Sequence, residues 1–143
     1  MTTIAWDGLV LAGDTLLVGR SFTRKGDKLF TINKDIYFGG CGCREDCLAV
    51  VEWLRNQRND KPDLDDSFAG ILVEKGKAYR LESKLMKSEI KEKHHSVGSG
   101  ASHAIVAMYL GQGAVEAIHT AAIFDCNTSF DVTYINVKGI AAP

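Results

Sequence analysis

The sequence has few features of membrane, secreted or nucleic-acid-binding proteins. It contains two prolines and no hydrophobic run that approaches the roughly 20 residues of a membrane span. Its 17 basic and 18 acidic side chains give a net charge of -1, so we expect neither nucleic acid nor an anionic membrane as a partner. The first residues also lack the basic segment of a secretory signal, which favours a cytoplasmic location.

Cysteine is also scarce, and its positions predict free thiols rather than disulfides or a metal site. Thiols stay reduced in the cytoplasm, and the three clustered cysteines lack the paired C-x-x-C spacing of structural zinc sites. The adjacent His94 and His95 would point to opposite faces of a strand, which argues against a pair of ligands. We therefore expect no metal and no cofactor. The cysteines are Cys41, Cys43, Cys47 and Cys126.

The bulk composition is that of a globular chain with a substantial core. Hydrophobic residues make up 45% of the 143 residues and charged residues 24%, which is typical of one folded domain. We expect residues 1–143 to form a single domain. The mixture of alternating and helical hydrophobic patterns predicts an α+β fold class.

The first fourteen residues predict a β-hairpin. The Asp7-Gly8 pair lies between two apolar runs, and Gly accepts the positive φ of a tight turn. The first strand would begin at Thr2 and the second would end at Asp14, so the hairpin brings a hydroxyl beside a carboxylate.

The remaining pattern alternates strands and helices. The helix at 44–58 would bury an apolar stripe that includes Leu48, Val51, Trp53 and Leu54. The other expected segments, in order, are a loop at 15–23, strands at 28–32 and 36–41, strands at 67–74 and 77–81 joined at Lys75-Gly76, a strand at 89–97, helices at 101–110 and 114–124, a strand at 130–137 and a tail at 138–143.

Thr2 could act as a nucleophile if Met1 is removed. Its α-amino group would then titrate at a pKa of about 7.7–8.0 and could act as the base for its own hydroxyl. The structural alternative is that Thr2 is simply a β-branched residue at the start of a strand.

Several landmarks distributed over nearly the whole chain resemble the bacterial HslV peptidase and proteasome β-subunits. Each landmark alone is a weak signal, but they occur in the order of that family. They are Thr2-Thr3-Ile4, Ala12-Gly13-Asp14, the lysine segment 25–30, the glycine-rich strand end at 38–42, Gly98-Ser99-Gly100 and Asp125. The resemblance implies a four-layer αββα sandwich, the arrangement of N-terminal nucleophile hydrolases.

The resemblance also implies the reactive centre. Thr2 would be the nucleophile, while Asp14 and Lys28 would set the electrostatics around its hydroxyl. Without the resemblance, Lys28 could be a surface lysine on an edge strand. The backbone N–H of Gly42 would stabilise the oxyanion, although these glycines could equally mark a bulge.

Three further residues would support the amine of the nucleophile. Ser99 would hydrogen-bond near the threonine, although Ser99 or Ser102 could also cap the helix that follows. Asp125 and Thr128 would complete this support, and Asp125 could alternatively be a polar residue at a helix end. Cys43 and Cys47 could line the pocket for the residue before the cut, and the 15–23 loop would contribute to the substrate groove.

The implied function is hydrolysis of peptide bonds in peptides or unfolded polypeptides. Family resemblance further implies a homo-oligomeric ring and an AAA+ ATPase that feeds it. Two alternatives stay open. If Met1 is retained, the protein would be a catalytically silent assembly or binding subunit, and a closed groove would suit an amidohydrolase that acts on a small amide.

Overall fold

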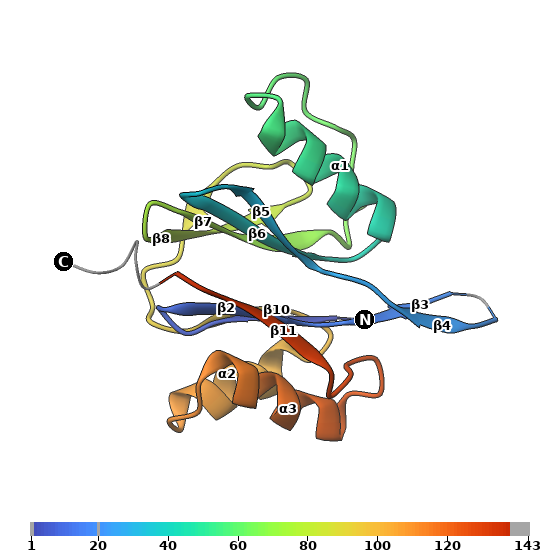
Figure 1. Ribbon diagram of the computed structural model, residues 1–143, viewed down its shortest axis with the longest axis vertical. Coiled ribbons are helices and arrows are strands. Elements are labelled where there is room, and N and C mark those ends of the chain that lie inside the picture. The colour runs from blue at the N-terminus through green and yellow to red at the C-terminus, as the bar shows by residue number, and fades with distance from the viewer. Residues whose placement is uncertain (1, 20, 138–143) are drawn as a thin grey trace.

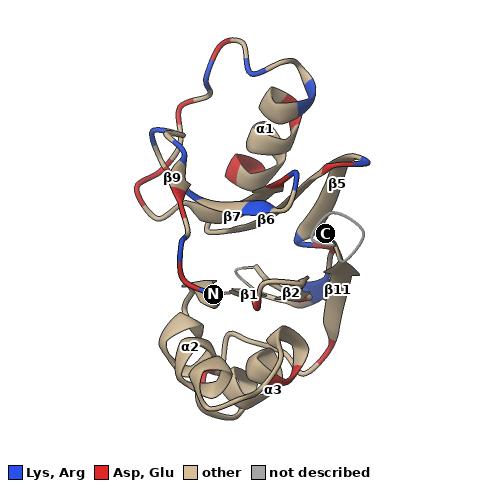
Figure 2. Cartoon of the chain, turned by 90° about the vertical axis from the view of Figure 1, so that its left-hand side faces the viewer, with Lys and Arg blue, Asp and Glu red and all other residues tan. Residues whose placement is uncertain are grey.

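Two antiparallel sheets lie face to face, with one helix on the outer face of the first and two helices on the outer face of the second (Figures 1 and 2). This computed structural model describes residues 2–19 and 21–137. The predicted four-layer αββα sandwich is therefore confirmed. The expected tail at 138–143 and Met1 lie outside the described residues.

One sheet has four strands and contains the predicted N-terminal hairpin. Its turn is held by Asp7, whose Oδ1 accepts hydrogen bonds from the N–H groups of Leu9 at 2.9 Å and Val10 at 2.8 Å. Gly8 has φ of +98°, as the turn requires. The strand begins at Thr3 rather than at Thr2. In spatial order the strands are β10 (His95–Gly98), β1 (Thr3–Trp6), β2 (Val10–Asp14) and β11 (Val132–Asn136).

The other sheet has five strands and contains the second predicted hairpin. Lys75 and Gly76 have φ of +51° and +81°, so both occupy the left-handed region of a two-residue turn. The predicted continuous strand at 89–97 is wrong, because the chain leaves this sheet after β9 and enters the other sheet at β10. The strands in spatial order are β5 (Leu29–Asn33), β6 (Ile36–Cys41), β7 (Ala69–Glu74), β8 (Lys77–Glu82) and β9 (Ser88–Glu89).

The segment expected as a loop at 15–23 instead forms a third hairpin. Strands β3 (Leu16–Val18) and β4 (Thr23–Lys25) pair antiparallel and extend beyond the edge of the stacked sheets (Figure 1). Their side chains are mostly exposed, so the sequence lacks the alternation of a half-buried strand. The pairing of Leu16 with Lys25, Leu17 with Arg24 and Val18 with Thr23 defines this hairpin.

Three helices cover the outer faces. Helix α1 ends before residue 58, because Gln57 and Arg58 have φ of +58° and +62°, and Leu48 is 45% exposed rather than part of the buried stripe. The prediction for 114–124 is confirmed, and no helix in the described ranges is long and apolar enough to cross a membrane. The helices are α1 (Arg44–Arg55), α2 (Ala101–Tyr109) and α3 (Ala114–Phe124).

Each interface between layers has its own hydrophobic cluster. The β1 side chains alternate, so Ile4 packs between the sheets and Ala5 packs beneath the helices. Ala5 pairs with Ala12 in the sheet, and these small side chains let α2 and α3 approach closely. Phe38 and Trp53 belong to the cluster between α1 and the five-stranded sheet. The site described next lies where the two sheets meet at one end.

Candidate active site

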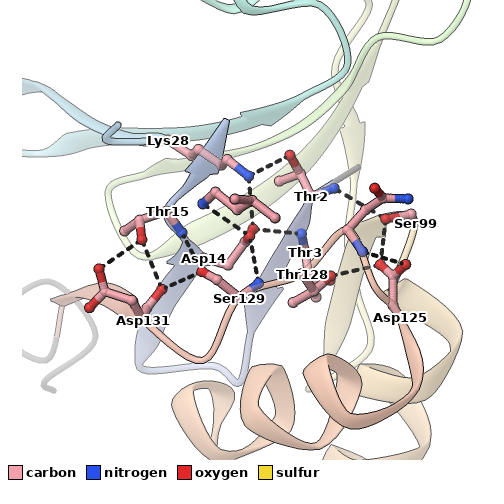
Figure 3. A network of polar contacts seen from close by, with 12 residues as sticks. Thr2, Thr3, Asp14, Thr15, Lys28, Ser99, Asp125, Thr128, Ser129 and Asp131 are labelled. Carbon is pink, nitrogen blue, oxygen red and sulfur yellow. Dashed lines mark hydrogen bonds and ion pairs between the residues drawn. The ribbon is translucent and has the colours of Figure 1, made fainter. Parts of the chain in front are cut away.

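Thr2, Asp14 and Lys28 meet at the contact between the two sheets (Figure 3). Lys28 lies just before β5, whereas Thr2 precedes β1 and Asp14 ends β2 of the facing sheet. The Lys28 Nζ donates hydrogen bonds to Thr2 Oγ1 at 2.8 Å and to Asp14 Oδ1 at 3.0 Å. All three residues are buried, with exposed fractions of 4%, 0% and 4%.

Asp14 is anchored by the backbone as well as by Lys28. Its Oδ1 accepts a hydrogen bond from the N–H of Thr3 at 3.0 Å, and its Oδ2 accepts from Leu16 at 3.3 Å and Ser129 at 3.1 Å. A buried carboxylate with this many donors has the partners that its desolvation requires. The carboxylate therefore fixes the position of Lys28 against Thr2.

Burial lowers the pKa of Lys28 below its ordinary value, and the Coulombic attraction of Asp14 opposes this shift. A lowered pKa makes the ammonium group a stronger acid than an ordinary lysine. In its charged form, Lys28 stabilises a deprotonated Thr2 hydroxyl through the contact at 2.8 Å. The pair is thus suited to activating an oxygen nucleophile.

A second set of hydrogen bonds reaches the nitrogen of Thr2. The Thr2 N–H donates to Ser99 Oγ at 3.2 Å, and Ser99 Oγ donates to Asp125 Oδ2 at 2.5 Å. Thr128 Oγ1 donates to the same carboxylate oxygen at 2.7 Å. Desolvation alone would raise the pKa of Asp125, but the hydrogen bonds from Ser99 and Thr128 hold it below its ordinary value.

The structure adds two residues that the sequence reasoning did not assign. Thr3 Oγ1 lies 2.7 Å from Thr128 Oγ1, and the Thr3 N–H binds Asp14, so Thr3 links both sets of contacts. Ser129 contributes only its backbone N–H to Asp14. Thr3 could have been found from the sequence, because a hydroxyl inside an apolar strand is buried and needs a hydrogen-bond partner. The contact of Ser129 could not have been found from the sequence, because any residue except proline supplies a backbone N–H.

Gly98 allows the backbone to pass close to Thr2. It has φ of +106°, and a Cβ at this position would lie 1.9 Å from the Thr2 carbonyl oxygen. At Gly100 a Cβ would lie 2.2 Å from Thr3 Oγ1. Both glycines of the predicted Gly98-Ser99-Gly100 turn are therefore required by the close approach of Thr2 and Thr3.

Gly42 has φ of +107° and lines two cavities that border the site. The first cavity has a volume of about 350 Å³ and lies between Thr2, the β3–β4 hairpin and the start of α1. The second has a volume of about 440 Å³ and includes Gly98 and Ser99. The seven predicted residues thus gather at one place, while the roles assigned to them stay predictions.

Within the ranges 2–19 and 21–137, no group of three or more histidine, cysteine or acidic side chains could hold a metal ion. All four cysteines are free thiols. Of the two proposed as pocket residues, Cys43 is exposed and lines the first cavity, whereas Cys47 is buried in the cluster beneath α1.

Thiol labelling should separate these cysteines. Burial raises the pKa of the Cys47 thiol to about 12 and also raises that of Cys41, so neither forms a thiolate at neutral pH. We expect N-ethylmaleimide to modify Cys43 and Cys126 in the native protein and to leave Cys41 and Cys47 unmodified. Peptide mapping by mass spectrometry measures this pattern, and labelling in urea is the control that exposes all four thiols. Rapid native labelling of Cys47 would contradict the described packing.

Comparison with known proteins identifies the fold. No family model matches the chain, and no curated protein matches it. Among solved structures, HslV of Trypanosoma brucei superposes with a TM-score of 0.70 at 15% identity, covering 94% of this chain and 97% of that chain. Thiobacillus denitrificans BPH superposes with a TM-score of 0.69 at 15% identity, covering 95% and 97% of the two chains. Its complex with epoxomicin gives 0.69 at 16% identity, covering 95% and 98%. The chain therefore has an α+β fold of the kind found in HslV and other proteasome-like proteins.

Proposed function

We propose that this protein is a peptidase whose nucleophile is an N-terminal Thr2. The observation that carries the proposal is the separate support of the two reacting atoms. Lys28 Nζ contacts Thr2 Oγ1 at 2.8 Å, and Ser99 Oγ contacts Thr2 N at 3.2 Å. A purely structural threonine at a strand start would need neither a buried lysine nor this chain of hydroxyls.

The reaction requires removal of Met1, which converts the nitrogen of Thr2 into a primary amine. The amine, directly or through a water molecule, accepts the proton of Oγ1 as that oxygen forms a bond to the carbonyl carbon of the substrate. Lys28 stabilises the negative charge on Oγ1, and Asp14 holds Lys28 in place. The Gly42 N–H receives the oxyanion of the tetrahedral intermediate.

Collapse of the intermediate breaks the peptide bond. The protonated Thr2 amine gives its proton to the departing nitrogen, which leaves an ester between Thr2 Oγ1 and the acyl part of the substrate. Ser99, Asp125 and Thr128 keep the amine oriented throughout. Water, activated by the same amine, then hydrolyses the ester and restores the hydroxyl.

The proposed substrate is a peptide or an unfolded polypeptide, and the proposed assembly is a homo-oligomeric ring. Similarity of fold to HslV supports both proposals. An AAA+ ATPase partner and a cytoplasmic location stay predictions of the sequence. Native mass spectrometry distinguishes a ring peptidase from a monomeric amidohydrolase that acts on a small amide.

Intact mass measured before and after exposure to epoxomicin tests the reaction. Epoxomicin suits this test because the structure of Thiobacillus denitrificans BPH, which has a similar fold, contains it. We expect a native mass that lacks Met1, a single covalent adduct on Thr2, and hydrolysis of fluorogenic peptides. Thr2→Ala is the control, and Thr3→Ala reports whether the adduct forms on the neighbouring hydroxyl instead.

Retention of Met1 with no adduct would contradict the peptidase proposal. The catalytically silent assembly or binding subunit would then be the better description, because an amide nitrogen cannot serve as the base. An adduct that persists in Thr2→Ala would show that another residue is the nucleophile.

A further inference from the structure

If the proposed reaction takes place at Thr2, the two cavities beside it would receive opposite sides of the bond to be cut. The second cavity includes Ser99, which contacts the nitrogen of Thr2. In the proposed reaction this nitrogen protonates the leaving group, so the leaving side of the substrate lies there. Thr2 and Gly42 line the first cavity, and Gly42 lies between the two. The residue before the cut therefore enters the first cavity.

The lining of the first cavity combines apolar side chains with two arginines. Leu17 and Phe22 of the β3–β4 hairpin are apolar, and the charged lining residues are Arg24 and Arg44. No acidic side chain lines it. Neither arginine forms an ion pair with any carboxylate in the part of the chain that the structure describes. The cavity thus carries uncompensated positive charge.

Arg44 is held at the cavity rather than extended into solvent. Its Nη1 donates a hydrogen bond to the backbone carbonyl of Asp27, and its guanidinium lies 5.7 Å from the centre of the Phe30 ring. The hydrogen bond uses one of the five N–H donors of the Arg44 guanidinium. Because the carbonyl oxygen is uncharged, it does not neutralise the positive charge of Arg44. An arginine positioned in this way suits a carboxylate, which it can bind through two parallel hydrogen bonds.

We propose that the first cavity selects an acidic side chain, so that the protein cuts polypeptides after glutamate or aspartate. This inference rests on the proposed function and names the specificity of the same site. Arg44 binds the carboxylate, and Arg24 on strand β4 adds a second positive charge. The side chains of Leu17 and Phe22 contact the methylene groups of glutamate. The preference comes from Arg24 and Arg44 and not from the Thr2 centre.

Two fluorogenic peptides that differ only in glutamate or glutamine before the cut give the sharpest test. The two side chains match in shape, so their kcat/KM ratio reports charge recognition. We expect the glutamate peptide to be cut about 10- to 100-fold more efficiently. Arg44→Ala should bring the ratio close to one, with most of the loss in kcat/KM falling on the glutamate peptide. Arg44→Glu should favour a lysine peptide over the glutamate peptide.

Arg55→Ala is the matched control, because Arg55 lies at the other end of α1 and does not line the cavity. Equal cleavage of the glutamate and glutamine peptides by the unmodified protein would overturn the inference. So would a loss in Arg44→Ala that affects both peptides alike. In these two outcomes epoxomicin still modifies Thr2, so the proposed function survives. A protein that takes no epoxomicin and cuts no peptide overturns both.

Discussion

Asp14→Asn is expected to lower the free energy of unfolding by about 3–5 kcal/mol. The substitution keeps the shape of the side chain but removes the charge that compensates the buried Lys28. It also places an NH₂ group where a carboxylate oxygen accepted hydrogen bonds. With Oδ2 replaced, the N–H groups of Leu16 and Ser129 would face a donor. Unpaired buried donors carry the full cost of their desolvation.

Urea denaturation followed by tryptophan fluorescence measures this loss. Asp131→Asn is the matched control, because Asp131 forms an ion pair with Lys25 in which the side chains are 52% and 78% exposed. Its effect should be much smaller, since exposed pairs contribute little to stability. Equal midpoints for Asp14→Asn and the unmodified protein would show that Asp14 does not hold the buried contacts described above.

Lys28→Met is expected to lower kcat/KM for peptide hydrolysis by about 10²–10³-fold. Methionine fills nearly the same volume, and the three backbone donors to Asp14 remain to compensate its buried charge in part after the ion pair is lost. What disappears is the positive charge 2.8 Å from Thr2 Oγ1. The loss should fall mainly on kcat, because Lys28 acts on the nucleophile rather than on bound substrate.

Steady-state kinetics and the rate of epoxomicin addition both measure this effect. Lys25→Met is the control, because it removes an exposed lysine three positions earlier, outside the contacts of Thr2. Circular dichroism spectra of the two variants establish that both are folded. Unchanged hydrolysis by Lys28→Met would mean that the Thr2 hydroxyl reacts without help from the lysine.

Local sequence rules predicted part of the site, and the family resemblance predicted most of the rest. The Asp7-Gly8 turn correctly brought the start of β1 near the end of β2. Lys28 lies on the other sheet, and no local rule predicts contact across two stacked sheets. Only the order of landmarks along the chain placed it beside Asp14.

The errors have physical causes that can be named. The β3–β4 hairpin is mostly exposed, so its side chains show no regular hydrophobic alternation that the sequence could reveal. The segment predicted as one strand at 89–97 crosses from the five-stranded sheet to the four-stranded sheet. Its local composition does not indicate which strand each half pairs with. Helix α1 ends early because Gln57 and Arg58 adopt positive φ, which neither residue type favours.

The contacts around Thr2 join parts of the chain that are far apart in sequence. Ser99 lies 97 positions from Thr2, and Thr128 lies 125 positions from Thr3. Ribosomes make the chain from its N-terminus, and such long loops close late in folding. A nascent chain therefore exposes Thr2 well before Asp125 and Thr128 exist to support it. In the proposed peptidase, this wide spacing leaves Thr2 without its full set of contacts until residues 125 and 128 have been made.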